Sequence, residues 1–241
     1  GSLADNNYGG LENLSLIPGN VGTTPIQNIG AYGTEIKDTF VSCNALNIDT
    51  LETETFTKDD CEFAYRESIF KGKLKGKYII TSVIFKLTKT DHKINTAYGD
   101  IAAKLTENNI VVPTIKDVSD AVIAIRQSKL PNPKEIGNSG SFFKNPIITT
   151  EQFEKVYRNN PKMPYYTISE TEVKVPAGWL IEQSGFKGKR FGDAGVHSKQ
   201  ALVLVNYGNA TGQEILNLSH KIQETVFNNF GIHIENEVNI I

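Results

Sequence analysis

The sequence predicts an α+β chain in two parts, a sheet domain followed by an α/β domain. Alternating and β-branched residues dominate from residue 38 to residue 88, which is typical of an antiparallel sheet. After Pro131, patterns of strands and helices alternate instead. With 241 residues, 39% of them hydrophobic, the chain is long enough for one large core or two smaller ones. We therefore expect domains at residues 3–130 and 131–230, with a closing strand at 231–241 that returns to the first part.

The first part is expected to begin with a loop and to continue into strands. Residues 10–36 are rich in Gly, Asn and Thr, which indicates a loop. Strands are expected over residues 39–48, 51–57 and 78–87. The two glycines within residues 71–77 indicate a hairpin turn. A helix is expected to begin near Asp117 or Ser119 and to run to Leu130.

Helix caps mark the elements of the second part. Thr149 and Gln152 have the spacing of a capping box before one helix, and Pro176 suits the first turn of another. Thr211 and Glu214 predict the start of a long helix with one apolar face. The remaining elements are a buried strand at 201–206, the end of the long helix at Gly231 and a strand at 232–241.

Charge and composition exclude several classes of partner. The 25 basic and 27 acidic residues are mixed along the chain, so no basic patch predicts nucleic-acid binding. No run approaches the roughly 20 apolar residues of a membrane span. Cys43 and Cys61 are far apart and form no Cys-x-x-Cys motif, so neither a disulfide framework nor a metal site is indicated. We expect a monomer in the reducing cytoplasm.

The N-terminus suggests that the chain is part of something longer. Gly1-Ser2 is typical of the residues that remain after a purification tag is cleaved. The only methionine is Met163, so no native start is represented. We therefore expect an internal fragment that lacks an upstream segment.

The segment GNSGSFFKNP, from Gly137 to Pro146, groups small and polar residues around two aromatics. Its small residues allow a tight turn and the close approach of a ligand. Ser141 follows where the chain resumes an extended path. Considered alone, the segment is more typical of a glycine-rich turn that opens a strand. The other motifs of the chain favour a functional interpretation.

Seven motifs occur in the order in which one family carries them. They are residues 17–33 (IPGNVGTTPIQNIGAYG), 65–71 (YRESIFK), 98–100 (YGD), 129–131 (KLP), 137–146, 192–202 (from GDAGVH to QAL) and 235–238 (ENEV). Together they resemble UDP-N-acetylenolpyruvoylglucosamine reductase, the MurB family of peptidoglycan synthesis. The resemblance covers essentially the whole chain. It implies a truncated FAD-binding sheet domain of the PCMH/MurB type, followed by an α/β substrate-binding domain.

The resemblance implies an NADPH-dependent flavoenzyme, a UDP-N-acetylmuramate dehydrogenase of the cytoplasm. FAD would take a hydride from NADPH and pass it to the enolpyruvyl ether of UDP-N-acetylglucosamine. The product would be UDP-N-acetylmuramate, a precursor of the cell wall. The implied partners are therefore one small-molecule substrate and two cofactors, FAD and NADPH.

Three residues align with the catalytic residues of the family. Arg66 would stabilise the enolate that hydride addition leaves, since its guanidinium fork suits a carboxylate. Ser141 would give a proton to the enolate carbon, which is a strong enough base to take one from a hydroxyl. Glu237 would share charge with Arg66 or, if protonated, donate to the enolate. Each residue type alone is more often found in a turn, a salt bridge or a solvated surface.

The resemblance also implies two sets of binding residues. Contacts with the substrate's diphosphate, nucleotide and sugar are implied for Tyr98, Lys129, Asn145, Tyr166 and Gln200. Contacts with FAD are implied for Gly19, Gly22, Asn28, Gly30, Gly33 and Arg126. We call residues 19–33 the flavin loop. Its glycines do not come directly after a predicted strand, so Rossmann-type rules of dinucleotide binding do not apply.

The chain departs from the family at its beginning. The family's first subdomain, with a second glycine-rich loop for the flavin phosphates, is absent from the sequence. We therefore expect this chain to bind FAD weakly or not at all, while the domain at 131–230 keeps its fold. One alternative function is a catalytically silent fragment that binds a UDP-sugar. Another is a related flavin oxidase, but Tyr98 and the Ser141 segment suit a diphosphate-linked substrate better.

Overall fold

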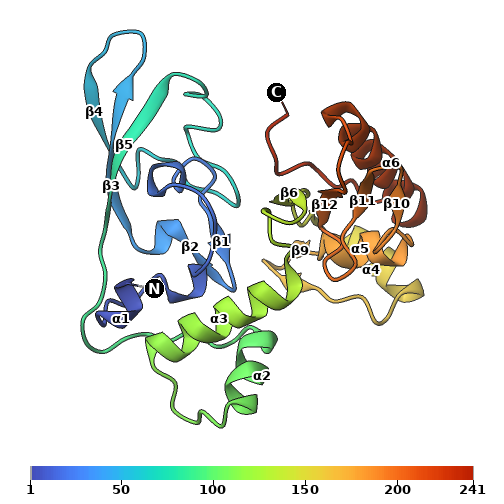
Figure 1. Cartoon of the computed structure of the whole chain (residues 1–241), viewed down its shortest axis with the longest axis horizontal. Coiled ribbons are helices and arrows are strands. Elements are labelled where there is room, and N and C mark those ends of the chain that lie inside the picture. Colours follow the sequence, from blue (N-terminus) through green and yellow to red (C-terminus); the bar gives the residue numbers. More distant parts are fainter. Residues whose placement is uncertain (1, 241) are drawn as a thin grey trace. The chain divides into compact units, whose positions relative to one another are not determined.

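The computed structural model describes residues 2–240, which form a mixed α+β fold of two compact units (Figure 1). Unit 1 extends to Ser128 and unit 2 begins at Lys129. The predicted α+β class is confirmed. Each unit has hydrophobic clusters of its own, so each is described separately.

Unit 1 contains a three-stranded antiparallel sheet. Its strands are β3 (Phe40–Asn47), β4 (Thr53–Thr57) and β5 (Tyr78–Phe85), in the order β4-β3-β5. Cys43 lies opposite Phe56 on one side of β3 and opposite Val83 on the other. Cys43 and Ala45 are only 1% and 0% exposed, because alternate residues of a strand point to the same face. The three predicted strands are confirmed.

The hairpin turn expected at residues 71–77 is wrong. β4 and β5 both pair with β3 and not with each other, so residues 58–77 form a crossing connection. The connection carries Cys61, whose thiol hydrogen-bonds that of Cys43 although both cysteines are free. This bond and burial raise the pKa of the Cys61 thiol, and the same bond lowers the pKa of Cys43.

Short elements precede the sheet, where the sequence predicted a loop. They are α1 (Ser2–Asp5), the 3₁₀ turns η1 (Glu12–Leu14), η2 (Val21–Thr23) and η3 (Ile36–Asp38), and the strands β1 (Gly30–Ala31) and β2 (Thr34–Glu35). β1 and β2 form a hairpin whose two loop residues are Tyr32 and Gly33. The rest of residues 10–36 is irregular, as predicted.

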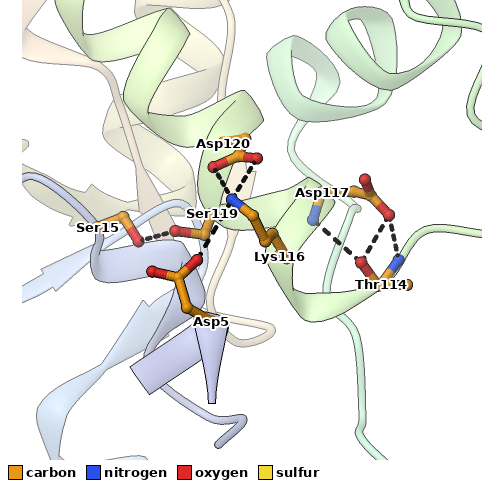
Figure 2. Close-up of polar contacts among 7 residues, drawn as sticks. All are labelled: Asp5, Ser15, Thr114, Lys116, Asp117, Ser119 and Asp120. Carbon is orange, nitrogen blue, oxygen red and sulfur yellow. Dashed lines mark hydrogen bonds and ion pairs between the residues drawn. The ribbon is translucent and has the colours of Figure 1, made fainter. Parts of the chain in front are cut away.

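Two helices complete unit 1. α2 (Gly99–Glu107) was not predicted, and α3 (Ile115–Lys129) begins earlier than the expected Asp117 or Ser119. The Thr114 hydroxyl accepts from the Asp117 amide at 3.2 Å, while the Asp117 carboxylate accepts from the Thr114 amide at 2.8 Å (Figure 2). This reciprocal cap explains the earlier start.

Unit 2 contains two antiparallel sheets and three helices (Figure 1). One sheet has the order β10 (Arg190–Phe191), β11 (Ala194–Val196), β12 (Val203–Asn206) and β6 (Gly137–Ser141). The other has the order β7 (Ile147–Thr149), β9 (Glu172–Lys174) and β8 (Tyr166–Thr167). The helices are α4 (Thr150–Asn159), α5 (Ala177–Gln183) and α6 (Gly212–Phe230). Leu180 of α5, Ile222 of α6 and Val196 of β11 meet in one fully buried core.

The caps of α4 and α6 agree with the sequence, whereas Pro176 is the N-cap of α5 and precedes its first turn. The Thr149 hydroxyl accepts from the Gln152 amide, and Thr211 and Glu214 form the reciprocal capping box of α6. Gly231 ends α6 with a φ of 65°. The strand expected at 232–241 is wrong for its described part. Residues 232–240 are irregular and form an isolated bridge between Asn236 and Phe143.

Residues 2–240 lack two classes of feature. No helix there has the length and apolar character that a membrane crossing requires. The same residues contain no cluster of three or more His, Cys, Asp or Glu side chains placed to hold a metal ion.

Candidate active site

Arg66 of unit 1 occupies a tight turn and lies against the β1–β2 hairpin. Ala64 and Glu67 exchange backbone hydrogen bonds at 3.1 and 3.2 Å, and Arg66 between them has a φ of 55°. Its Nη2 donates to the carbonyl of Gly30, and its Nη1 lies 3.8 Å from Oε1 of Glu35. The Arg66 side chain is 16% exposed. This cation is therefore oriented by the hairpin before any ligand arrives.

Two glycines of the predicted flavin loop pack closely against other parts of unit 1. A Cβ on Gly30 would lie 2.7 Å from Nη1 of Arg66, and one on Gly22 would lie 2.9 Å from the Ile80 carbonyl oxygen. A side chain at residue 22 would displace the backbone of β5, and one at residue 30 would displace the guanidinium of Arg66. These glycines allow the loop to lie close to Arg66 and to β5.

Asn28 is buried and holds the same loop in place. Its side chain is 0% exposed. Its Nδ2 donates to the Ala64 carbonyl at 3.0 Å, and its Oδ1 accepts from the Lys37 amide at 3.1 Å. Asn28 thus connects the flavin loop with the turn that carries Arg66. Any contribution of Asn28 to cofactor binding stays a prediction.

A cavity of about 290 Å³ lies beside the start of the flavin loop. Its lining includes Leu11, Leu14, Ile17, Pro18, Gly19, Val21, Ile29 and Phe85. Ser15 and Ser119 also line it, and their hydroxyls are 2.7 Å apart (Figure 2). A volume near the lower end of the ~300–1,000 Å³ range for ligand pockets suits one part of a dinucleotide. The lining is mainly apolar, and Gly19 is the glycine of the predicted flavin loop that belongs to it.

Arg126 and Tyr98 contact the tip of the hairpin through Tyr32. The Tyr32 hydroxyl hydrogen-bonds the guanidinium of Arg126, whose Nε also donates to the Leu16 carbonyl at 3.3 Å. Burial lowers the pKa of Arg126 and raises that of Tyr32. The Tyr98 ring meets the Tyr32 ring edge-on, with centroids 5.7 Å apart. The hairpin therefore brings together Gly30, Gly33, Arg66, Tyr98 and Arg126 of the predicted residues.

Ser141 of unit 2 follows a β-bulge at the edge of its sheet. Ser141 pairs with Val203 and Asn138 pairs with Val205, so Ser139 and Gly140 together lie opposite one residue of β12. Gly140 has a φ of 75°, and a Cβ there would meet nothing within 4 Å. The bulge therefore redirects the strand just before Ser141 and leaves open space beside it. Ser141 itself is exposed.

The residues after Ser141 lie between two other segments of unit 2. The Phe142 amide donates to the Leu202 carbonyl at 2.7 Å, and the Phe142 carbonyl accepts from the Glu237 amide at 2.8 Å. The Lys144 amide donates to the Glu235 carbonyl at 2.9 Å. The predicted Ser141 and Glu237 are thereby held on neighbouring segments.

Asn145 and Gln200 lie in the same region. Oδ1 of Asn145 accepts from the Ala177 amide at 2.9 Å and so caps the first turn of α5. Oε1 of Gln200 accepts from the Leu202 amide at 3.3 Å. Both side chains are thus fixed around the segment that follows Ser141.

Tyr166 and Lys129 belong to other elements than Ser141 does. Tyr166 belongs to β8 of the other sheet, is 43% exposed and has the Lys174 ammonium 5.7 Å from its ring centroid. Lys129 is the last residue of α3 and the first of unit 2. Arg66 belongs to unit 1 and Ser141 to unit 2.

Comparison with known proteins identifies the family. Residues 132–241 match the UDP-N-acetylenolpyruvoylglucosamine reductase C-terminal domain. UDP-N-acetylenolpyruvoylglucosamine reductase of Flavobacterium johnsoniae is 74% identical over 237 residues, which are 98% of this chain and 70% of that protein. The chain belongs to this family. The reductase of Chromobacterium violaceum is 48% identical, over 98% of this chain and 69% of its own length.

A solved structure supports the fold of the family. The crystal structure of the reductase (MurB) from Thermus caldophilus aligns with a TM-score of 0.65 and 23% identity. The alignment covers 99% of this chain and 66% of that one. This chain therefore has the MurB-like α+β fold and spans about 70% of the length of the Flavobacterium johnsoniae relative.

Sequence reasoning missed two features of the candidate site. His197 continues β11 opposite Val203, and Val203 pairs with Ser141 on its other side. The buried Nδ1 of His197 has no hydrogen-bond partner among residues 2–240, and burial lowers the pKa of the imidazole. The bulge at Ser139 and Gly140 was also missed. Neither feature has a local sequence signal, because both depend on how β12 pairs with its neighbours.

Proposed function

We propose that this chain acts in an NADPH- and FAD-dependent reductase of UDP-N-acetylglucosamine enolpyruvate. The product would be UDP-N-acetylmuramate, made in the cytoplasm for the cell wall. The observation that supports this best is the bulge before Ser141, combined with the backbone bonds that hold Glu237 on the neighbouring segment. In a family of reductases, this arrangement supports a hydroxyl and an acidic residue that act at one site.

Each catalytic residue has a role in the reaction. FAD, when bound, supplies the hydride that it has taken from NADPH. Hydride addition to the methylene carbon leaves negative charge on the adjacent carbon and the carboxylate. Arg66 stabilises this charge, because its orientation by the hairpin costs nothing at the moment of reaction. Ser141 gives its hydroxyl proton to the adjacent carbon, and Glu237 shares charge or donates a hydrogen bond.

The binding residues divide by domain in this proposal. Residues 3–130 hold the flavin, through the loop that contains Gly19, Gly22, Asn28, Gly30 and Gly33 and through Arg126. Residues 131–230 hold the substrate through Asn145 and Tyr166 at the nucleotide and diphosphate and Gln200 at the sugar. Lys129 and Tyr98, which precede this domain, also contact the nucleotide and diphosphate. The fixed Oδ1 of Asn145 supports its part, because a side chain already immobilised by α5 loses little entropy on binding.

A second function is favoured by the size of the cavity. Its volume of about 290 Å³ accommodates only part of a dinucleotide. A chain that binds FAD weakly or not at all would be a silent UDP-sugar-binding protein. That alternative predicts substrate affinity without turnover.

The test is an NADPH oxidation assay with excess FAD, combined with calorimetry of substrate binding. The proposed function predicts NADPH oxidation that depends on UDP-N-acetylglucosamine enolpyruvate and a product heavier by two hydrogens. Binding of substrate without any NADPH oxidation would support the second function. If the chain neither bound the substrate nor oxidised NADPH, both proposed functions would be contradicted.

A further inference from the structure

The side-chain amide of Asn13 joins two distant segments of unit 1. Asn13 belongs to η1 and is 2% exposed. Its Nδ2 donates to the carbonyl of Tyr32 at 2.9 Å and to the carbonyl of Asn95 at 3.0 Å. An amide nitrogen carries two hydrogens, so both are used, and only the nitrogen end can face two carbonyls. Asn13 was not singled out by the sequence analysis.

One of these carbonyls belongs to a strained turn. Tyr32 and Gly33 are the two loop residues of the β1–β2 hairpin, with φ values of 49° and 77°. Hairpin turns with positive φ at both positions favour Asn, Asp and Gly, and a tyrosine there strains the backbone. Nδ2 of Asn95 also reaches the Gly33 carbonyl, at 3.4 Å. The bonds from Asn13 and Asn95 therefore stabilise a conformation that Tyr32 by itself disfavours.

This turn determines where three candidate site residues lie. Gly30, two residues before Tyr32, accepts the hydrogen bond from Arg66. The Tyr32 ring contacts the Tyr98 ring, and the Tyr32 hydroxyl contacts Arg126. A change in the backbone at Tyr32 would move the surroundings of all three.

We propose that Asn13 is a positioning residue, whose amide holds the Tyr32–Gly33 turn and thereby orients Arg66 and Tyr98. Its effect on turnover rests on the proposed function. Its effect on the hairpin does not, so the two can fail separately.

Hydrogen exchange of the whole chain tests the effect on the hairpin. Asn13→Ala leaves the Tyr32 and Asn95 carbonyls without their donor, so exchange in peptides covering 28–36 should accelerate about tenfold. The matched control is Asn47→Ala, which removes an amide of unit 1 that bonds the Tyr78 hydroxyl and the Asp49 amide. Asn47→Ala should leave 28–36 unchanged. Unchanged exchange of 28–36 in Asn13→Ala would overturn the proposal.

A double-mutant cycle keeps the test informative if Asn13→Ala folds poorly. Tyr32→Gly removes the strain that Asn13 opposes, so Asn13→Ala should lower the unfolding midpoint less in the Tyr32→Gly background than alone. The role given to Asn13 would be contradicted if the effects of the two substitutions were strictly additive. It would also be contradicted if Asn13→Ala failed to fold and Tyr32→Gly did not restore folding.

Turnover tests the consequence for the reaction. With excess FAD, Asn13→Ala should lower kcat about tenfold and change the substrate KM much less, because Arg66 acts on the charge of the transition state. Asn47→Ala should leave both constants unchanged. Faster exchange of 28–36 with an unchanged kcat would refute a positioning role. A wild-type chain without turnover would refute the proposed function instead, while the exchange comparison would still decide whether Asn13 holds the turn.

Discussion

Ser141 carries the clearest expectation for a single side chain. If its hydroxyl supplies the proton, Ser141→Ala should lower kcat by about 10²–10⁴-fold, which is typical for loss of a general acid. Substrate affinity should change little, because the backbone around the bulge stays paired with β12. Stopped-flow turnover and calorimetric titration measure the two quantities.

A serine elsewhere in unit 2 provides the control for this substitution. Ser169 is exposed and its hydroxyl contacts only the nearby Thr171 among the bonds described. Ser169→Ala should therefore keep both turnover and affinity. Retained turnover in Ser141→Ala would show that another group protonates the carbon.

Asp193 should make the stability of unit 2 depend on pH. Its carboxylate accepts from the Asn209 amide at 2.9 Å and from Arg190 at 2.5 Å, and these bonds lower its pKa. Since the folded pKa lies below the unfolded one, this contribution to stability is present above about pH 4 and is lost as the pH falls through the folded pKa.

Thermal unfolding between roughly pH 2 and pH 7 measures this dependence on pH. In Asp193→Asn, stability should decrease less at acidic pH than it does in the wild type. Glu224→Gln, at an exposed position of α6, is the matched control and should leave the curve unchanged. If stability fell equally at acidic pH in the wild type and in Asp193→Asn, this account would be contradicted.

The capping box of α6 is the clearest expectation for an element. Thr211→Ala removes the hydroxyl that accepts from the Glu214 amide, which should cost about 1 kcal/mol in the free energy of unfolding. In the same helix, Thr225→Ala removes only a hydroxyl bonded to the Lys221 carbonyl one turn earlier. Calorimetry should show a lower Tm for Thr211→Ala and little change for Thr225→Ala. Equal Tm values in the two variants would refute the cap's contribution.

The elements that the sequence predicted well are those with local signals. β3, β4 and β5 follow from alternation, while α4 and α6 follow from caps whose partners are three residues apart. α2 was missed because its N-cap is Tyr98, which is not a preferred cap residue. The hairpin at 71–77 was wrong because β3 lies between β4 and β5, and strand order is not encoded locally.

The candidate site could be predicted only as a set of residues. Motifs resembling the family supplied Arg66 and Ser141, whereas their surroundings depend on contacts between distant segments. Asn13 contacts Asn95 across 82 positions, and no local pattern predicts such a bond. The bulge before Ser141 likewise results from the register between β6 and β12.

At the scale of the whole molecule, the two units separate the two proposed tasks. The cavity and the flavin loop are formed by residues of unit 1 alone, while Ser141 and Glu237 are held by backbone bonds within unit 2. Each unit also has its own buried clusters. Weak flavin binding by unit 1 would therefore leave the core of unit 2 intact.

A visible absorption titration of the whole chain with FAD, with and without UDP-N-acetylglucosamine enolpyruvate, tests the central claim most directly. The account predicts that the flavin band is perturbed at excess FAD and shifts again when substrate is added, with the flavin lost on dialysis. Flavin retained stoichiometrically after dialysis would contradict the expected weak binding. A flavin spectrum unchanged at every concentration, with or without substrate, would contradict a reductase role for this chain.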